Sequence, residues 1–183
     1  MTADRDPITR LLQDDRVTAP TRAALTARLN PATVPRPHVF NFEEFARLEA
    51  LSVRLVPHDP AHMPLARRID ARLASGDTDG WRYDHLPPDE ASYRALLAAL
   101  PGDFTALDGG LQDEALHALQ AAHPHAFEDL LAELTEGYYS HPAAQAAIGY
   151  VGFADAHGWT ETRLDRLDPN EAAALALLRG EDA

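Results

Sequence analysis

The feature that most restricts the fold is the spacing of apolar residues, which recur at helical intervals in segments separated by prolines. The segment after Asn41 is the clearest example, because Asn41 and Glu44 have the spacing of a helix capping box. Its core-facing side chains would be Phe45, Leu48, Leu51 and Leu55. No segment shows the sustained alternation of a β-strand. The sequence therefore predicts an all-α fold, an irregular helical bundle with proline-rich loops.

The same patterns place the other helices and divide the chain. Helices are expected over 7–15, 20–29 and 89–100, on both sides of Pro124, after Pro142 and between Asp168 and Gly180. Gly76 and Gly137 are each expected to end a helix, because glycine adopts a positive φ at little cost. The predicted divisions are an N-terminal helical hairpin (1–30), a proline-rich linker or intersubunit arm (31–40) and a helical domain (41–183).

Charge and cysteine content exclude several classes of function. The chain has 16 basic and 29 acidic side chains, a net charge of −13, and every basic residue is an arginine. Such a charge repels phosphate backbones and anionic lipids, so neither nucleic-acid binding nor direct membrane insertion is expected. Without cysteine there is no disulfide, thiolate metal site or cysteine nucleophile. With no secretory signal or membrane span recognisable, the expected location is the cytoplasm, or the periplasm only if a partner carries the chain.

Histidines and carboxylates raise the possibility of metal binding or catalysis. The histidine clusters are His58, Asp59 and His62, and His117, His123 and His125, which could equally be solvated loop residues. Candidates for acid–base or acyl chemistry are Ser140, Glu133, Glu136, Asp155, His141 and His157. The sequence contains no nucleophile elbow, phosphate-binding loop or dinucleotide-binding glycine motif. We therefore expect no catalytic, metal-binding or cofactor-binding residue in this chain.

The segment from Leu134 to Trp159 is the densest in both aromatic residues and glycines. Glycines at 149, 152 and 158 each directly precede an aromatic residue, which places flat rings on backbone that can approach another surface closely. Such rings either fill the core of a small domain or anchor a partner. The candidate partner-binding residues are Tyr138, Tyr139, Tyr150, Phe153 and Trp159, together with Trp81 and Tyr83 from an earlier loop.

Two elements of this segment, E-G-Y-Y-S-x-P and I-G-Y-x-G-F, resemble the signature of the gluconate 2-dehydrogenase subunit 3 family. Upstream, the F-E-E-F sequence at 42–45 and the G-W-R-Y sequence at 80–83 are similar as well, and the resemblance covers roughly residues 38 to 160. One departure is the A-A-Q-A-A run at 143–147, where the family usually has a segment rich in glycine and asparagine.

The resemblance implies an accessory role in an oxidoreductase complex. In that family the chain is a small subunit without a cofactor of its own, and it accompanies a large FAD-dependent flavoprotein of the glucose-methanol-choline type. A cytochrome subunit often completes the complex. The expected function is therefore a non-catalytic subunit that binds, stabilises or escorts the flavoprotein. The alternatives are a stand-alone histidine- or metal-dependent enzyme and a self-associating helical module.

Overall fold

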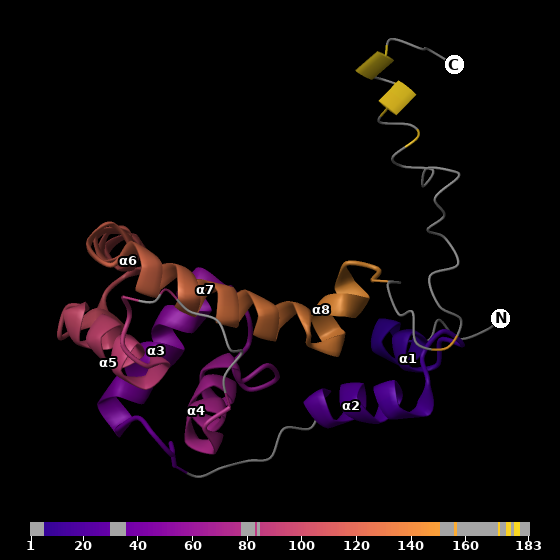
Figure 1. The fold of residues 1–183 in the computed structure, drawn as a ribbon, viewed down its shortest axis with the longest axis horizontal. Helices are drawn as coiled ribbons and strands as arrows, with labels where there is room; N and C mark the ends of the chain where they lie inside the picture. The colour runs from indigo at the N-terminus through magenta and orange to yellow at the C-terminus, as the bar shows by residue number, and fades with distance from the viewer. Residues whose placement is uncertain are drawn as a thin grey trace.

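The computed structural model describes residues 6–29, 36–77, 83, 85–150, 156, 172, 175, 176, 178 and 179. The helices with described bounds are α1 (Pro7–Leu12), α2 (Ala19–Leu29), α3 (Phe42–Leu55), α4 (Leu65–Ser75), α5 (Asp89–Ala99), the 3₁₀ helix η1 (Phe104–Ala106), α6 (Gly109–Ala122), α7 (Pro124–Tyr139) and α8 (Pro142–Ala147) (Figure 1). No described residue lies in a strand, which confirms the predicted all-α class over these ranges.

Several helix ends lie where the sequence places them, because local hydrogen bonds and backbone angles fix them. At the start of α3 the Glu44 amide donates to Asn41 Oδ1 at 2.9 Å, and the Asn41 amide donates to Glu44 Oε2 at 2.8 Å, which completes the capping box. Gly76 ends α4 with a φ of 73°. Pro124 occupies the first turn of α7, and His123 separates α7 from α6.

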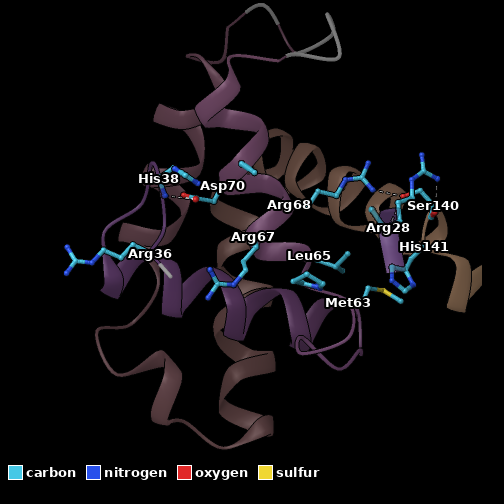
Figure 2. Close-up of a pocket in the computed structure, with 13 residues that line it drawn as sticks. Arg28, Arg36, His38, Met63, Leu65, Arg67, Arg68, Asp70, Ser140 and His141 are labelled. Atoms are coloured by element: carbon cyan, nitrogen blue, oxygen red, sulfur yellow. Dashed lines mark hydrogen bonds between the residues drawn. The ribbon is translucent and has the colours of Figure 1, made fainter. Parts of the chain in front are cut away.

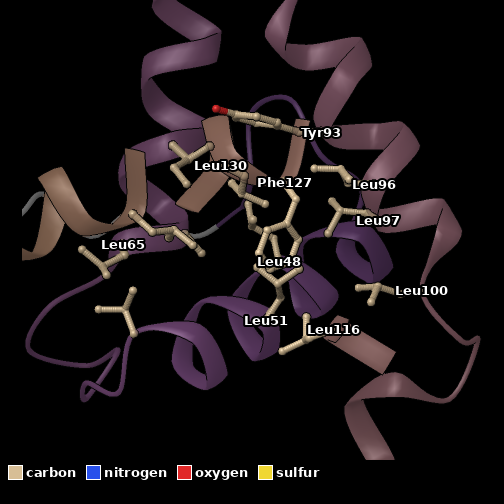
Figure 3. Close-up of a cluster of buried hydrophobic side chains, with 14 of the residues drawn as sticks. Leu48, Leu51, Leu65, Tyr93, Leu96, Leu97, Leu100, Leu116, Phe127 and Leu130 are labelled. Carbon is tan, nitrogen blue, oxygen red and sulfur yellow. The ribbon is translucent and has the colours of Figure 1, made fainter. Parts of the chain in front are cut away.

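A continuous hydrophobic core joins α3, α4, α5, α6 and α7 with η1 (Figure 3). At its centre lie side chains with no exposed surface: Leu48, Leu51, Leu97, Phe104 and Leu130. Complete burial of such a side chain contributes about 1.5–3 kcal/mol relative to exposure. These positions therefore carry much of the stability of the α3–α7 bundle.

The prediction that Gly137 ends a helix is wrong. The helix continues through Gly137 to Tyr139, and the Ser140 amide still donates to the Glu136 carbonyl at 2.9 Å. Gly137 is buried, and a Cβ placed on it would lie 3.2 Å from Leu65 Cδ2. The glycine therefore allows α7 to approach α4 closely, and it has no part in terminating α7.

Of the two helices expected at the N-terminus, α2 ends at Leu29 as predicted, whereas α1 ends at Leu12 instead of continuing to Asp15. Both α1 and α2 pack on α8, at the opposite end of the molecule from α5 and α6 (Figure 1). The buried apolar residues of the hairpin, Leu11, Val17 and Leu25, lie outside the main core cluster. The molecule thus consists of the α3–α7 bundle and a smaller unit, which we call the hairpin end, made of α1, α2 and α8.

Other sequence predictions fall partly or wholly outside the described residues. Of the predicted linker, the structure describes 36–40, where the His38, Val39 and Phe40 amides all donate to the carboxylate of Asp70 on α4. The predicted last helix, from Asp168 to Gly180, lies mostly outside the described residues.

Candidate functional site

A pocket of about 410 Å³ lies where the hairpin end meets the bundle (Figure 2). One face of α4 forms part of its wall, with Leu65, Arg68 and Ala71 at helical spacing. Arg28 of α2 contributes from the hairpin end, and the junction between α7 and α8 contributes as well. Three helical segments that are distant in the sequence therefore build one cavity, of a volume typical for small-molecule sites.

Positive charge is concentrated around this pocket, although the chain as a whole is strongly acidic. Arg28, Arg36, Arg67 and Arg68 all line it. Among its described lining residues the one acid is Asp70, which is 3% exposed. The oxygens of Asp70 accept the three amide hydrogen bonds from 38–40, at 2.6, 2.9 and 3.1 Å. Asp70 thus attaches the segment that carries Arg36 and His38 to α4.

Two of the arginines converge on Ser140, directly after the end of α7 (Figure 2). Arg28 Nη1 donates to the Ser140 carbonyl at 2.9 Å, and Arg68 Nη1 donates to the Ser140 hydroxyl. That hydroxyl in turn donates to the Gly137 carbonyl at 3.0 Å. A second contact of Arg68 is exposed Glu136, 3.7 Å from Nη2. Because a guanidinium has five N–H donors, these contacts leave each arginine able to bind an anion.

His141 places an unpaired donor at the pocket wall. Its ring caps α8, because Nδ1 accepts a hydrogen bond from the Ala143 amide at 3.2 Å. Nδ1 is therefore unprotonated, and the proton of the neutral ring is on Nε2. The residue is 7% exposed, and Nε2 is buried without a hydrogen-bond partner. Burial lowers the pKa of His141 below its usual value; the Arg28 backbone opposes this shift and the positive charge of Arg28 adds to it, so the ring is neutral near pH 7.

The N-terminus of α4 adds to the positive character of the pocket. Pro64 occupies the cap position without a side-chain hydrogen bond, and the first turn contains no acidic residue. That turn contains Arg67 and Arg68 instead. Cations near a helix N-terminus are unfavourable because the helix dipole is positive there. An anion in the pocket would relieve this local excess of positive charge.

The predicted aromatic anchors do not form one patch. Tyr139 and Tyr150 are 53% and 40% exposed, whereas Tyr138 is half-buried against the main core. Tyr83 lies elsewhere: its hydroxyl donates to Glu128 Oε2 at 2.9 Å, and its ring stacks on His125 at 4.1 Å. Glu128 and Tyr139 are separated by roughly 16 Å along α7. The remaining predicted anchors, Trp81, Phe153 and Trp159, lie outside the described residues.

Large apolar side chains are exposed at the end of α7 and after α8, on either side of the junction that lines the pocket. Tyr139 lies two residues after Gly137, the α7 residue that lines the pocket, and its ring packs edge-on against Tyr138 with centroids 5.2 Å apart. Ile148, which follows α8, is 57% exposed. We call Tyr139, Ile148 and Tyr150 the apolar edge. Exposed tyrosines are among the residues that most often anchor protein interfaces.

The histidine clusters do not assemble into a metal site within the described ranges, where no group of three or more histidine or acidic side chains could hold an ion. In the first cluster His62 Nδ1 contacts Asp59 Oδ2 at 2.6 Å, while His58 Nδ1 faces the Val56 carbonyl. In the second, His125 Nδ1 lies 3.0 Å from His85 Nε2, and the sequence did not suggest that partner.

Of the acid–base candidates, Glu136, Ser140 and His141 lie together at the end of α7, whereas Glu133 belongs to a different network. Glu133 accepts hydrogen bonds from Arg72 Nε at 2.5 Å, from Arg72 Nη2 at 2.8 Å and from the Tyr93 hydroxyl at 2.8 Å. Glu133 raises the pKa of Arg72, and burial followed by the Glu133 charge raises the pKa of Tyr93. This network links α4, α5 and α7 and leaves Glu133 without contact to Ser140. Asp155 and His157 lie outside the described residues.

Sequence reasoning did not identify the arginine-lined pocket. Its charged residues come from α2, from the segment before α3 and from α4, so no spacing along the chain unites them. The available signal was compositional: a chain with a net charge of −13 and no lysine places four of its 16 basic residues around a single cavity. That signal becomes visible only once the fold is known.

Comparisons with models of known protein families, with curated proteins and with solved structures find no match to this chain. Within the described ranges, none of the helices has the length and apolar character needed to cross a membrane.

Proposed function

We propose that this chain is a non-catalytic subunit that binds and stabilises a larger partner through the apolar edge. The partner expected from the sequence resemblance is an FAD-dependent flavoprotein of the glucose-methanol-choline type, with gluconate 2-dehydrogenase as the model complex. The flavoprotein would hold the FAD, and a cytochrome subunit would be a further member of the complex. An escort of this kind needs no active site, because binding only the folded form of a partner stabilises that form.

The observation that carries the proposal is the exposure of Tyr139 at the end of α7 and of Ile148 and Tyr150 after α8, by 53%, 57% and 40%. Aromatic side chains of this size are enriched among the residues that dominate binding energy at protein interfaces. The two tyrosines also belong to the sequence elements that carry the family resemblance. Surface apolarity and sequence similarity thus point to the same segment.

The test is co-expression with the flavoprotein encoded beside this chain, followed by affinity purification at low and at moderate salt. We expect the two proteins to co-purify. The double variant Tyr139→Ser, Ile148→Ser should lower the recovered partner at least about tenfold, because hot-spot truncations cost 2 kcal/mol or more. The control is Leu111→Ser on α6, an apolar residue that is 46% exposed and lies outside the apolar edge, and it should have no effect. Failure to co-purify at both salt concentrations would contradict the proposal.

Self-association is the second candidate, because the same apolar edge could pair with a second copy of the chain. Sedimentation velocity of the isolated chain distinguishes the two. A dimer that the double variant converts to monomer would favour self-association. A monomer that joins a complex only when the flavoprotein is present would favour the escort function.

A further inference from the structure

The pocket combines two chemical characters that together define a class of ligand. Part of its lining is apolar: Met63, Pro64, Leu65, Ala71 and Gly137. Its remaining wall carries four guanidinium groups, and the one carboxylate among the described lining residues is occupied by backbone amides. An apolar ligand would make no use of the guanidinium donors of Arg28 and Arg68, and a small inorganic anion would leave the apolar wall uncovered. The lining fits a molecule that has both parts.

The donors converge at one end of the pocket. Arg28 and Arg68 both bind Ser140, one at its carbonyl and one at its hydroxyl, so their guanidinium groups lie close together. His141 follows Ser140 in the chain and contributes the buried, unpaired Nε2–H. Figure 2 shows Met63 next to the His141 ring, and both residues line the pocket. A methionine side chain is flexible enough to move aside for a ligand group that reaches Nε2.

We propose that this pocket binds an amphipathic organic anion, a small molecule with a carboxylate or phosphate head and an apolar chain. The head lies between Arg28 and Arg68 and accepts hydrogen bonds from both, which arginine forks provide for either group. The apolar chain runs along α4 over Leu65 towards Ala71. His141 Nε2–H gains the acceptor that it lacks in the unliganded chain. The pocket lining shares no residue with the apolar edge, so this inference does not depend on the proposed escort function.

The experiment is isothermal titration calorimetry of the full chain near pH 7 with four probes: octanoate, octyl phosphate, octanol and acetate. We expect saturable one-to-one binding of octanoate or octyl phosphate with a Kd below about 1 mM. Octanol, which lacks the charge, and acetate, which lacks the apolar chain, should each bind at least about tenfold more weakly. The ratio between the two octyl anions shows which head group the arginines prefer.

Matched variants locate the site. Ala71→Leu fills the pocket from an exposed helix position and should abolish octanoate binding. Ala74→Leu lies on the same helix but outside the pocket lining, so this variant should bind octanoate as the wild type does. Leucine is a good helix former, so both variants should keep the helix content of the wild type in circular dichroism. Arg68→Gln should weaken octanoate binding about tenfold, while the control Arg54→Gln, which removes an arginine paired with Asp113, should not.

His141→Asn tests the buried donor without removing the helix cap, because asparagine is itself a good capping residue. We expect octanoate to bind this variant about threefold to tenfold more weakly. Three results would each overturn the proposal. They are no saturable binding of either octyl anion, binding of octanol as tight as that of octanoate, and equal affinity of the Ala71→Leu and Ala74→Leu variants for octanoate. All are measured on the isolated chain, so they are unaffected by whether the flavoprotein co-purifies.

Discussion

The bundle and the hairpin end achieve order by different means. In the bundle, α3 to α7 share one large core whose central side chains have no exposed surface. The hairpin end buries few apolar side chains of its own within the described ranges, chiefly Leu11, Val17 and Leu25. It depends instead on arginines that bind carbonyl groups: Arg22 Nη2 donates to Val17 at 2.9 Å, and Arg28 Nη1 donates to Ser140 at 2.9 Å.

The two regions also differ in how completely their buried polar atoms are paired. In the bundle, the Arg72–Glu133–Tyr93 network satisfies a group of charges and a hydroxyl together. Three buried side-chain atoms in the described ranges nevertheless have no hydrogen-bond partner: Ser92 Oγ in the bundle, and His141 Nε2 and Gln145 Oε1 at the hairpin end. Binding regions are commonly drawn from the less stable parts of a protein. The bundle contains the larger core, while the pocket lies at the junction of the two regions.

The largest effect expected from this contrast is that of Leu130→Ala in the bundle. Leu130 is 0% exposed, and its truncation leaves a cavity at the centre of the core. We expect the free energy of unfolding, measured by urea denaturation, to fall by about 3–5 kcal/mol. All probes should report one cooperative transition, because the whole bundle shares this core.

Leu25→Ala makes the same chemical change at the hairpin end, where Leu25 is 2% exposed. Here the loss of global stability should be clearly smaller, because the bundle can stay folded after α1 and α2 detach. Hydrogen exchange should show lower protection of the α1 and α2 amides while the α3 and α7 amides keep theirs. Equal losses in the two variants would show that the hairpin end and the bundle unfold as one unit.

The next effect concerns the ion-pair network of the bundle. Glu133→Gln keeps the shape of the side chain but removes the charge that pairs with Arg72, whose side chain is 23% exposed. We expect the free energy of unfolding, measured by urea denaturation, to fall by about 2–3 kcal/mol. The loss is not larger because Arg72 retains Asp89 as an acidic partner. The control is Glu43→Gln, whose pair with Arg47 is on the surface and should contribute less than about 0.5 kcal/mol.

The bundle could be predicted from the sequence because its signals are local. Apolar spacing, the Asn41 capping box and the prolines each specify structure within a few residues of themselves. Gly137 shows where local reasoning fails. A glycine that ends a helix and one that admits a neighbouring helix look alike in sequence, and only the position of Leu65 on α4 decides between them.

The candidate site was predictable only in part, for the same reason. Tyr139 and Tyr150 were identified because they lie in one short segment of unusual composition. Tyr83 was grouped with them by residue type, although it packs near the start of α7 against His125. The pocket depends on Arg28 of α2 reaching Ser140, and the hairpin is held there by contacts with α8 that no sequence pattern encodes.

A smaller effect compares the helix caps of the two regions. Asn41→Ala removes the capping box of α3 and should lower the free energy of unfolding by about 1 kcal/mol. Asp6→Ala removes the cap of α1, where Asp6 Oδ2 accepts from the Thr9 amide at 3.2 Å. We expect this second variant to change the exchange of α1 amides with little change in global unfolding. A global loss of equal size would mean that α1 contributes to the cooperative core.

The smallest effect is a pH dependence confined to the hairpin end. Burial holds the pKa of His141 in the folded state below its unfolded value of about 6.5. Between the folded and the unfolded pKa, the unfolded state therefore binds more protons than the folded state. The stability contributed by the neutral ring is therefore present above about pH 6.5 and is lost as the pH falls through the folded pKa. Hydrogen exchange of α8 amides at pH 7 and pH 5, corrected for intrinsic rates, should show less protection at pH 5. His141→Asn should remove this difference, and unchanged α8 protection in the wild type would show that the ring is not buried in its neutral form.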